Sequence, residues 1–338
     1  MNSHFDRQHA FEMSGVHIRP RRLRRSEAIR GFVRETHLDV SNLVLPQFIL
    51  PGKHERQPIT SMPDFYRLSV DHAVTQAKEA YGLGLRGVAL FPVLPQNKKD
   101  ATGSESKNPQ GLIPTAVKAI KDAVPEMLVI TDVALDPYSS EGHDGLVREG
   151  EILNDESLEI LAEMAIAQAA SGADLVAPSD MMDGRIGYIR SALDQTGHRQ
   201  TGVLSYAAKY ASGFYGPFRE ALDSAPKFGD KKTYQMDPAN LSEALREAEL
   251  DVQQGADILM VKPGLPYLDV IASLYQHFSL PIAAYQVSGE YSMIMAAARN
   301  GWLDEKTTAV ESLLALRRAG SQMIFTYFAL KAANWLQK

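Results

Sequence analysis

Eight short apolar runs recur along this chain, and each is followed by a segment with the periodicity of a helix. Runs that are apolar throughout are typical of parallel strands buried on both faces, with helices as the crossover connections. Eight such units predict a protein of the α/β class with a (β/α)8 barrel, and an open doubly wound sheet is the alternative. The eight runs are residues 43–50, 87–93, 128–135, 175–178, 202–207, 258–261, 282–287 and 323–328.

A glycine pattern that occurs in dinucleotide-binding sheets is present at Gly82, Gly84 and Gly87. In those sheets the glycines follow a strand and open a helix. Here they follow a helical segment and precede the run 87–93. We therefore interpret them as a helix end and a turn, which favours the barrel over the doubly wound sheet.

Two segments lie outside the repeat. Residues 1–41 form a predicted N-terminal arm with the basic run 19–25, and residues 42–338 form the predicted catalytic barrel. The arm is interpreted first as a solvated segment and more specifically as one that embraces a neighbouring subunit. Residues 211–238 form a long connection after the fifth run, and loops of this length inside a compact domain are usually functional lids.

Charge and composition exclude several classes of protein. The net charge of −6 argues against a protein that binds a nucleic-acid backbone. The 338 residues include no cysteine, so a metal here would need oxygen or imidazole ligands. No apolar run reaches 18 residues and residues 1–25 show no signal-peptide pattern, so we expect a cytoplasmic protein without a membrane contact.

Lysines end two neighbouring predicted strands, at Lys209 and Lys262. Catalytic side chains of a barrel lie at the carboxyl ends of its strands, so both should face one cavity. Either lysine alone could be structural. Together, burial and the nearby like charge would lower the lysine pKa and leave a free amine at neutral pH. The pair predicts Schiff-base chemistry on a carbonyl substrate.

An acidic cluster follows the third run, at Asp132, Asp136 and Asp144. These carboxylates could bind a hard cation, balance the lysines or transfer protons. His143 beside them could be a metal ligand or a hydrogen-bonded loop histidine.

Long motifs in fixed order run nearly end to end through the chain: SMPDFYRLS, LFPV, TDVALDPYSSEGHDG, APSDMMDGRI, SYAAKYASGFYGPFR, KTYQMDP, LMVKPGLPYLD, AYQVSGEY and FTYFA. At these motifs the chain resembles the porphobilinogen synthase family, also called δ-aminolevulinic acid dehydratase. The resemblance implies a (β/α)8 barrel with an extended arm. It also implies condensation of two 5-aminolevulinate molecules to porphobilinogen, with loss of two waters, in haem, chlorophyll and corrinoid biosynthesis.

The resemblance also implies roles for single residues. Lys262 matches the family's Schiff-base lysine, and Lys209 matches its second active-site lysine. The carboxylate of the first substrate would be held by Ser288 and Tyr327. That of the second would be held by Arg219 and Lys231, with Gln235 close by.

Metal use and assembly are implied in the same way. Zinc-dependent members of the family have cysteines where this chain has Ala134, Asp136 and Asp144, so it resembles the aspartate-type branch, which is stimulated by Mg²⁺ and has no cysteine-bound catalytic zinc. Glu247 matches an allosteric Mg²⁺ ligand. The family assembles as homo-octamers of arm-embracing dimers. A class I aldolase and a catalytically silent barrel are the alternatives to this function.

Overall fold

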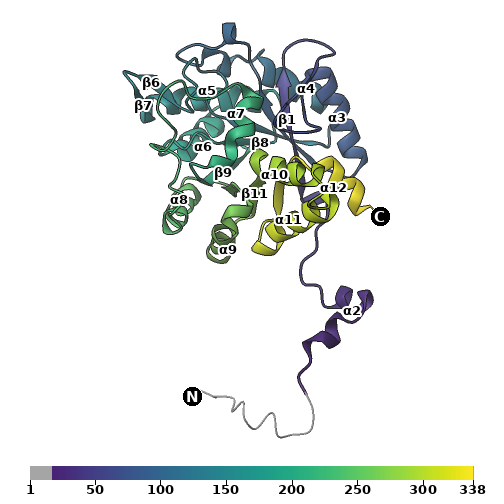
Figure 1. Cartoon of the computed structure of the whole chain (residues 1–338). Helices are drawn as coiled ribbons and strands as arrows, with labels where there is room; N and C mark the ends of the chain where they lie inside the picture. The colour runs from purple at the N-terminus through teal and green to yellow at the C-terminus, as the bar shows by residue number, and fades with distance from the viewer. Residues whose placement is uncertain (1–16, 338) are drawn as a thin grey trace, which may run out of the picture. The chain divides into compact units, whose positions relative to one another are not determined.

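The computed structural model describes residues 17–337 and confirms the barrel (Figure 1). Its parallel strands pair in chain order, and the last of them, β12, also pairs with β1, which closes the barrel. The barrel strands are β1 (Leu43–Leu50), β4 (Gly87–Pro92), β5 (Leu128–Val133), β8 (Leu175–Pro178), β9 (Gly202–Lys209), β10 (Ile258–Lys262), β11 (Ile282–Gln286) and β12 (Met323–Thr326).

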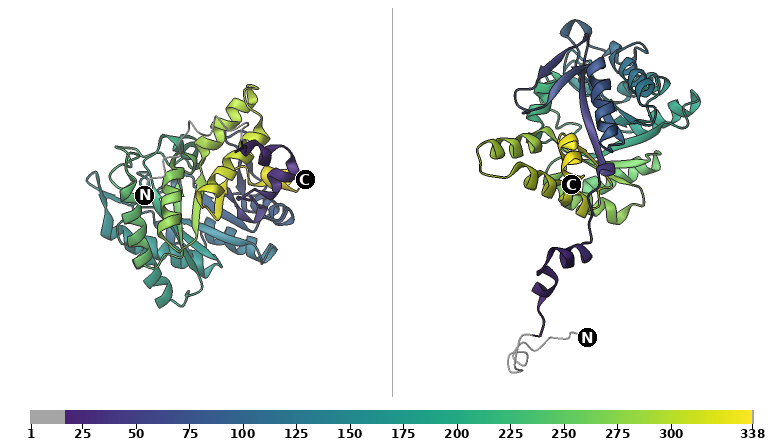
Figure 2. Two further views of the ribbon diagram at one scale, coloured as in Figure 1. Left: turned by 90° about the horizontal axis from the view of Figure 1, so that it is seen from below. Right: turned by 90° about the vertical axis from the view of Figure 1, so that its right-hand side faces the viewer.

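The strands are apolar because both of their faces are covered. Every residue of β1, β4 and β11 is buried. Helices surround the strands on the outside in all three views (Figures 1 and 2). They are α3 (Val70–Gly82), α4 (Leu112–Ala123), α5 (Asn154–Ala170), α6 (Arg185–Gln195), α8 (Ser242–Gln253), α9 (Leu268–His277), α10 (Ser288–Arg299), α11 (Glu305–Ala319) and α12 (Ala329–Leu336).

The register of the barrel brings the two predicted lysines together. Lys209 and Lys262 are the last residues of β9 and β10, and they are direct partners in that strand pair. Because all barrel strands are parallel, their carboxyl ends meet at one face of the molecule. The lysines, the lid and the acidic loop after β5 therefore share that face.

The glycine pattern has the structure that we expected. Helix α3 ends at Gly82, and β4 begins at Gly87. Gly84 between them has φ of +94°, a left-handed conformation that glycine adopts without a steric cost. Gly84 thus turns the chain from the helix that ends at Gly82 into the strand that begins at Gly87.

Several short elements were not predicted. Strand β3 (Tyr66–Ser69) pairs with β1 and with β2 (Arg56–Pro58), and β6 (Leu146–Arg148) pairs with β7 (Glu151–Leu153). They have no long buried run, so periodicity gives no signal for them. The predicted lid is also partly helical, with a 3₁₀ helix at Gly213–Tyr215 and α7 at Gly216–Leu222.

The chain divides into two compact units, with the boundary between His37 and Leu38. The described part of the first unit, residues 17–37, contains a 3₁₀ helix (Pro20–Arg24) and α2 (Glu27–Phe32), and neither helix has a buried residue. The predicted arm extends over residues 1–41, of which residues 1–16 lie outside the described part. Within residues 17–337, no helix combines the length and the apolar character that a bilayer crossing requires.

Candidate active site

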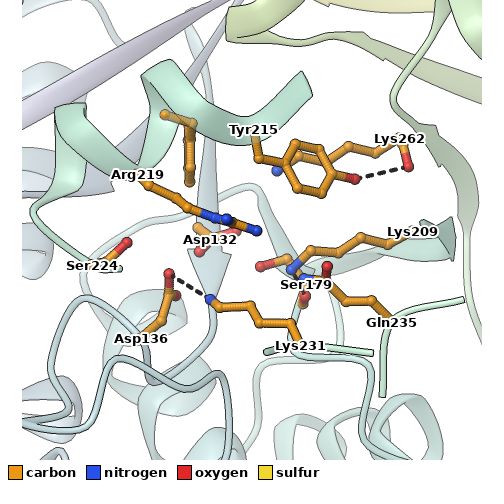
Figure 3. Close-up of a pocket in the computed structure, with 11 residues that line it drawn as sticks. Asp132, Asp136, Ser179, Lys209, Tyr215, Arg219, Ser224, Lys231, Gln235 and Lys262 are labelled. Carbon is orange, nitrogen blue, oxygen red and sulfur yellow. Dashed lines mark hydrogen bonds and ion pairs between the residues drawn. The ribbon is translucent and has the colours of Figure 1, made fainter. Parts of the chain in front are cut away.

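A pocket lies among the ends of β5, β9 and β10 and the lid (Figure 3). Side chains that are far apart in the sequence meet there, and most of those predicted for the site are among them. The lining residues are Asp132, Asp136, Ser179, Lys209, Tyr215, Phe218, Arg219, Ser224, Lys231, Gln235 and Lys262.

Lys262 lies in an aromatic environment, with only 4% of its surface exposed. Its Nζ is 4.7 to 5.5 Å from the ring centroids of Tyr206, Tyr215, Phe218 and Tyr285. Burial and the neighbouring Lys209 cation lower the pKa of Lys262 to about 7, although nearby Asp132 opposes the shift. At neutral pH a large share of this side chain is therefore an uncharged amine, the form that attacks a carbonyl group.

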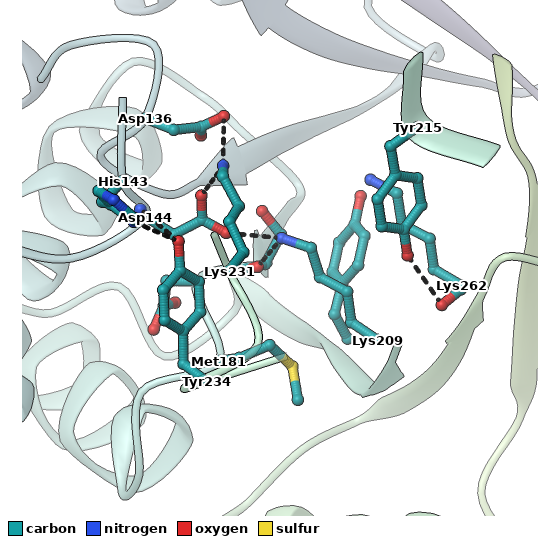
Figure 4. A network of polar contacts seen from close by, with 12 residues as sticks. Asp136, His143, Asp144, Met181, Lys209, Tyr215, Lys231, Tyr234 and Lys262 are labelled. Atoms are coloured by element: carbon teal, nitrogen blue, oxygen red, sulfur yellow. Dashed lines mark hydrogen bonds and ion pairs between the residues drawn. The ribbon is translucent and has the colours of Figure 1, made fainter. Parts of the chain in front are cut away.

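Lys209 and Lys231 share one buried carboxylate (Figure 4). Lys209 Nζ lies 2.9 Å from Asp144 Oδ2 and also donates to the Ser179 carbonyl oxygen. Lys231 Nζ contacts Asp144 Oδ1 and lies 3.4 Å from Asp136 Oδ2. Burial alone would raise the pKa of Asp144, but the two ammonium groups lower it to about 2. The carboxylate is therefore charged.

Asp132 differs from the other two aspartates. Burial raises its pKa to about 7, against the opposing effect of Lys262. Its Oδ1 is buried and has no hydrogen-bond partner among the described residues. A carboxyl group that titrates near neutral pH can both donate and accept a proton. The contacts thus separate the cluster, because Asp136 and Asp144 pair with lysines whereas Asp132 forms no ion pair among the described residues.

His143 forms hydrogen bonds with two residues of the lid. One ring nitrogen, Nδ1, lies 3.1 Å from the Tyr234 hydroxyl, and Nε2 lies 3.1 Å from the Phe228 carbonyl oxygen. The side chain is buried, and both of its nitrogens have partners. This matches the interpretation of a hydrogen-bonded loop histidine rather than that of a metal ligand.

Ser288 and Tyr327 are not among the residues that line the pocket. The Tyr327 hydroxyl lies 3.0 Å from that of Tyr285, whose ring is one of those around Lys262. Ser288 begins α10, and its buried Oγ has no hydrogen-bond partner within the described part of the chain. The Tyr327 hydroxyl therefore lies near the aromatic wall of the site, and Ser288 lies two residues after β11, the strand that carries Tyr285.

The comparisons with known proteins agree on one family. The family model described as Delta-aminolevulinic acid dehydratase matches residues 17–335. This chain belongs to the delta-aminolevulinic acid dehydratase family. It is 56% identical over 320 residues to the chloroplastic delta-aminolevulinic acid dehydratase of Physcomitrium patens, covering 94% of this chain and 74% of the relative. The enzyme of Bradyrhizobium diazoefficiens is 53% identical over 321 residues, which are 95% of this chain and 91% of the relative.

A solved delta-aminolevulinic acid dehydratase also matches in three dimensions. The crystal structure from Toxoplasma gondii ME49, in complex with the reaction product porphobilinogen, superimposes with a TM-score of 0.93 at 50% sequence identity. The match covers 95% of this chain and 92% of that one. The resemblance found in the sequence is confirmed.

Glu247 lies on α8 and lines a second pocket of this delta-aminolevulinic acid dehydratase fold. Glu247 is half-buried, and burial raises its pKa, opposed by Arg185 and assisted by Asp251 and Asp183. Gln235 lines both this pocket and the lysine pocket. The second pocket is lined by Asn154, Met181, Asp183, Lys232, Thr233, Tyr234, Gln235, Met236, Asp237, Asn240, Glu243 and Glu247.

Within residues 17–337, one set of three metal-ligating side chains lies close enough to hold an ion directly, namely His54, Asp71 and His72. His54 Nδ1 already lies 2.7 Å from Asp71 Oδ2, so the set is joined internally. The active-site aspartates form no such set in that part of the chain. The ammonium group of Lys231 lies between Asp136 and Asp144, where a shared cation would have to bind.

Sequence reasoning did not single out the aromatic residues of the site. Tyr206 and Tyr285 come from strands, and Tyr215 and Phe218 come from the lid. The sequence signal for these residues was their closeness to Lys209. Tyr206 precedes Lys209 in SYAAKY, and Tyr215 and Phe218 follow it in YASGFYGPFR. Ring packing around an amine requires three-dimensional placement, which spacing alone does not give.

Proposed function

We propose that Lys262 forms the Schiff base with 5-aminolevulinate in this active site. As a member of its family, the chain condenses two molecules of 5-aminolevulinate to porphobilinogen, with loss of two waters, in tetrapyrrole biosynthesis. The observation that supports the role of Lys262 is its placement. It is a buried strand-end amine with a pKa of about 7, directly beside a second lysine.

The chemistry follows from the charges around this amine. The free amine of Lys262 attacks the ketone carbon, and a proton moves from its nitrogen to the ketone oxygen. The hydroxyl group formed in this way leaves as water once it is protonated, which gives the protonated imine. Asp132 lines the same pocket and has a pKa of about 7, so it can supply that proton and later accept one. Lys209, held by Asp144, is the second lysine and is proposed to act on the second substrate molecule.

Two clamps are proposed to orient the two substrate molecules. Ser288 and Tyr327 would bind the first carboxylate through hydroxyl groups. Arg219, Lys231 and Gln235 would bind the second. Lys231 pairs with Asp144 and Asp136 in this structure, so a substrate carboxylate would join or replace these partners. Different chemistry at the two ends would let one cavity hold two copies of the same molecule in different orientations.

Borohydride reduction in the presence of 5-aminolevulinate tests the role of Lys262. We expect mass mapping to find the label on Lys262, and we expect Lys262→Ala to lose both the label and pyrrole formation. Lys306→Ala, at an exposed position of α11, is the control and should retain both. Turnover by Lys262→Ala at a rate near that of the wild type would exclude the mechanism.

We also propose that Mg²⁺ binds at Glu247 as an allosteric ion. The donor set fits this ion, because carboxylates of Asp183, Asp237, Glu243 and Glu247 line one pocket. Mg²⁺ typically keeps several waters and takes one or two carboxylates directly. With no cysteine in the chain, no thiolate can hold a catalytic zinc ion.

The proposed assembly is a homo-octamer of arm-embracing dimers in the cytoplasm. Apolar side chains of residues 17–37 support a role of this segment in subunit contacts, since Phe32 is 92% exposed and Ile18 is 77% exposed. Deletion of residues 1–37 is expected to give smaller particles in sedimentation velocity. An octamer formed by the truncated chain would contradict the role of the arm.

A further inference from the structure

Glu290 is a fully buried carboxylate that the reaction described above does not use. It lies in the first turn of α10, and none of its surface is exposed. Within residues 17–337 it has no ion pair with a lysine, arginine or histidine. Burial raises its pKa to about 7, against the opposing effect of three backbone N–H groups. A side chain in this environment is retained at a cost in stability, so its contacts call for an explanation.

The carboxylate accepts hydrogen bonds from two separate segments. Oε2 accepts from the Val287 N–H at 2.6 Å and from the Gly264 N–H at 3.3 Å. Oε1 accepts from the Leu265 N–H at 2.7 Å. One side chain therefore joins the turn after β10 to the junction of β11 and α10.

Each of these segments carries a residue of the proposed site. Lys262 ends β10, two residues before Gly264, and Ser288 directly follows Val287. The turn after β10 also packs tightly on β11, because a Cβ atom at Gly264 would lie 3.1 Å from the Tyr285 carbonyl oxygen. The backbone carbonyl oxygen of Lys262 accepts hydrogen bonds from the Tyr210 N–H and the Tyr215 hydroxyl.

We propose that Glu290 is a positioning residue, whose carboxylate fixes the separation between the imine-forming Lys262 and the carboxylate-binding Ser288. This rests on the proposed function, because it requires Lys262 to form the imine and Ser288 to bind the first substrate's carboxylate. A substrate that is bound at both ends requires a fixed distance between the two groups that bind it. In the proposal, Glu290 sets this distance between Lys262 and Ser288. Its effect should therefore appear with ketones that carry a carboxylate and not with ketones that lack one.

Two methyl ketones with the same five-carbon chain make this testable. Levulinate has a carboxylate at the chain end opposite its methyl ketone, and 2-pentanone has a methyl group there. The measurement is the rate at which borohydride traps each ketone on Lys262. In the wild type we expect levulinate to be trapped faster. The ratio of the two rates measures how well the lysine and the clamp are matched, and a general loss of stability would not change it.

Glu290→Gln keeps the size of the side chain but turns an NH2 group toward one or both segments. We expect the levulinate to 2-pentanone ratio to fall about 10- to 100-fold, as small misplacements of a catalytic group do. Asp257→Asn is the control away from the site, because the carboxylate of this exposed residue accepts a hydrogen bond from the Val203 N–H at 2.7 Å at the opposite end of the barrel. It should lower the urea midpoint and leave the ratio unchanged.

A second variant covers the case in which Glu290→Gln does not fold. Replacing the amide of Leu265 with an ester removes one N–H donor and leaves Glu290 intact, and it should lower the ratio in the same direction. Folded variants that keep the wild-type ratio would overturn the proposal. Absence of labelling of Lys262 in the wild type by both ketones and by 5-aminolevulinate would instead overturn the proposed function.

Discussion

The charge of Lys262 is set by a balance of opposing effects. Burial and Lys209 favour the neutral amine, whereas Asp132 favours the ammonium form. The four aromatic rings around the Lys262 Nζ also favour its charged form, and a single contact of this kind contributes about 0.5–2 kcal/mol. The same rings would stabilise the charged imine once it forms. The surroundings of Lys262 thus suit both the amine that attacks and the cation that results.

The pH dependence of imine formation tests this balance. Trapping on Lys262 should increase with pH through a midpoint near pH 7, because only the neutral amine reacts. Lys209→Met removes the neighbouring cation and should raise the Lys262 pKa, so that the midpoint moves to higher pH. Lys209→Arg keeps the charge and should leave the midpoint near that of the wild type. A shift to lower pH in Lys209→Met would contradict the assigned cause.

Asp144 links the lysines to the stability of the fold. Asp144→Ala leaves two buried ammonium groups without their shared partner and should lower the free energy of unfolding by about 3–5 kcal/mol. Urea denaturation at pH 7 measures the loss. Glu311→Ala, at an exposed position of α11, should change it by less than about 0.5 kcal/mol.

The sign of the pH effect follows from the lowered pKa of Asp144. The carboxyl has a pKa of about 2 in the folded chain and of about 4 when unfolded. Its ionisation therefore stabilises the fold fully above about pH 4, and this contribution is lost as the pH falls towards 2. The stability difference between wild type and Asp144→Ala should narrow over that interval. A difference that stayed constant down to pH 2 would show that the ion pairs are not its source.

At the scale of elements, apolar runs predicted the strands well and the connections poorly. The run 128–135 extends past β5, which ends at Val133, because Ala134 and Leu135 are buried in the turn rather than paired. The helix α7 was missed because Gly216 and Pro217 suggest a loop, although proline suits the first turn of a helix. The meeting of Lys209 and Lys262 in one site was predicted, because strand order alone makes the ends of β9 and β10 neighbours. The Lys231 pairing with Asp144 depends on how the lid folds, which no periodicity encodes.

The lid approaches α10 at a glycine. A Cβ atom at Gly289 would overlap the backbone of Phe214, in the same 3₁₀ helix as Tyr215. Gly289→Ala should therefore displace the lid and its Tyr215 hydrogen bond to Lys262, lowering kcat/KM about ten-fold or more. Steady-state kinetics with 5-aminolevulinate measure this effect.

Gly216→Ala is the matched control for that substitution. Gly216 begins α7 in the same lid, and a Cβ atom there would meet no other atom within 4 Å. Because its φ of −48° is helical, alanine should be tolerated or slightly stabilising. Equal kinetic losses in both variants would show that the close approach at Gly289 is not the cause.

At the scale of the whole molecule, family membership decides against the two alternative functions, a class I aldolase and a catalytically silent barrel. The proposed Mg²⁺ site would act on the reaction from a distance, because Glu247 lies outside the lysine pocket. Gln235 lines both pockets and so connects them. Chelation should lower activity, and Mg²⁺ should restore it whereas Zn²⁺ should not. Glu247→Ala should show low activity that no longer responds to Mg²⁺, with Lys262 still labelled by 5-aminolevulinate. Restoration by Zn²⁺ alone would exclude the oxygen-ligand assignment.

The closure of the barrel also limits how copies of this chain can associate. Because β12 pairs with β1, the ten-stranded sheet ends in the described chain at β2, a three-residue strand that contains Arg56 and Pro58. A short strand with a charge and a proline is a poor template for adding another strand. Addition of a strand from another copy at this end of the barrel sheet is therefore disfavoured, which opposes growth into fibres by that route.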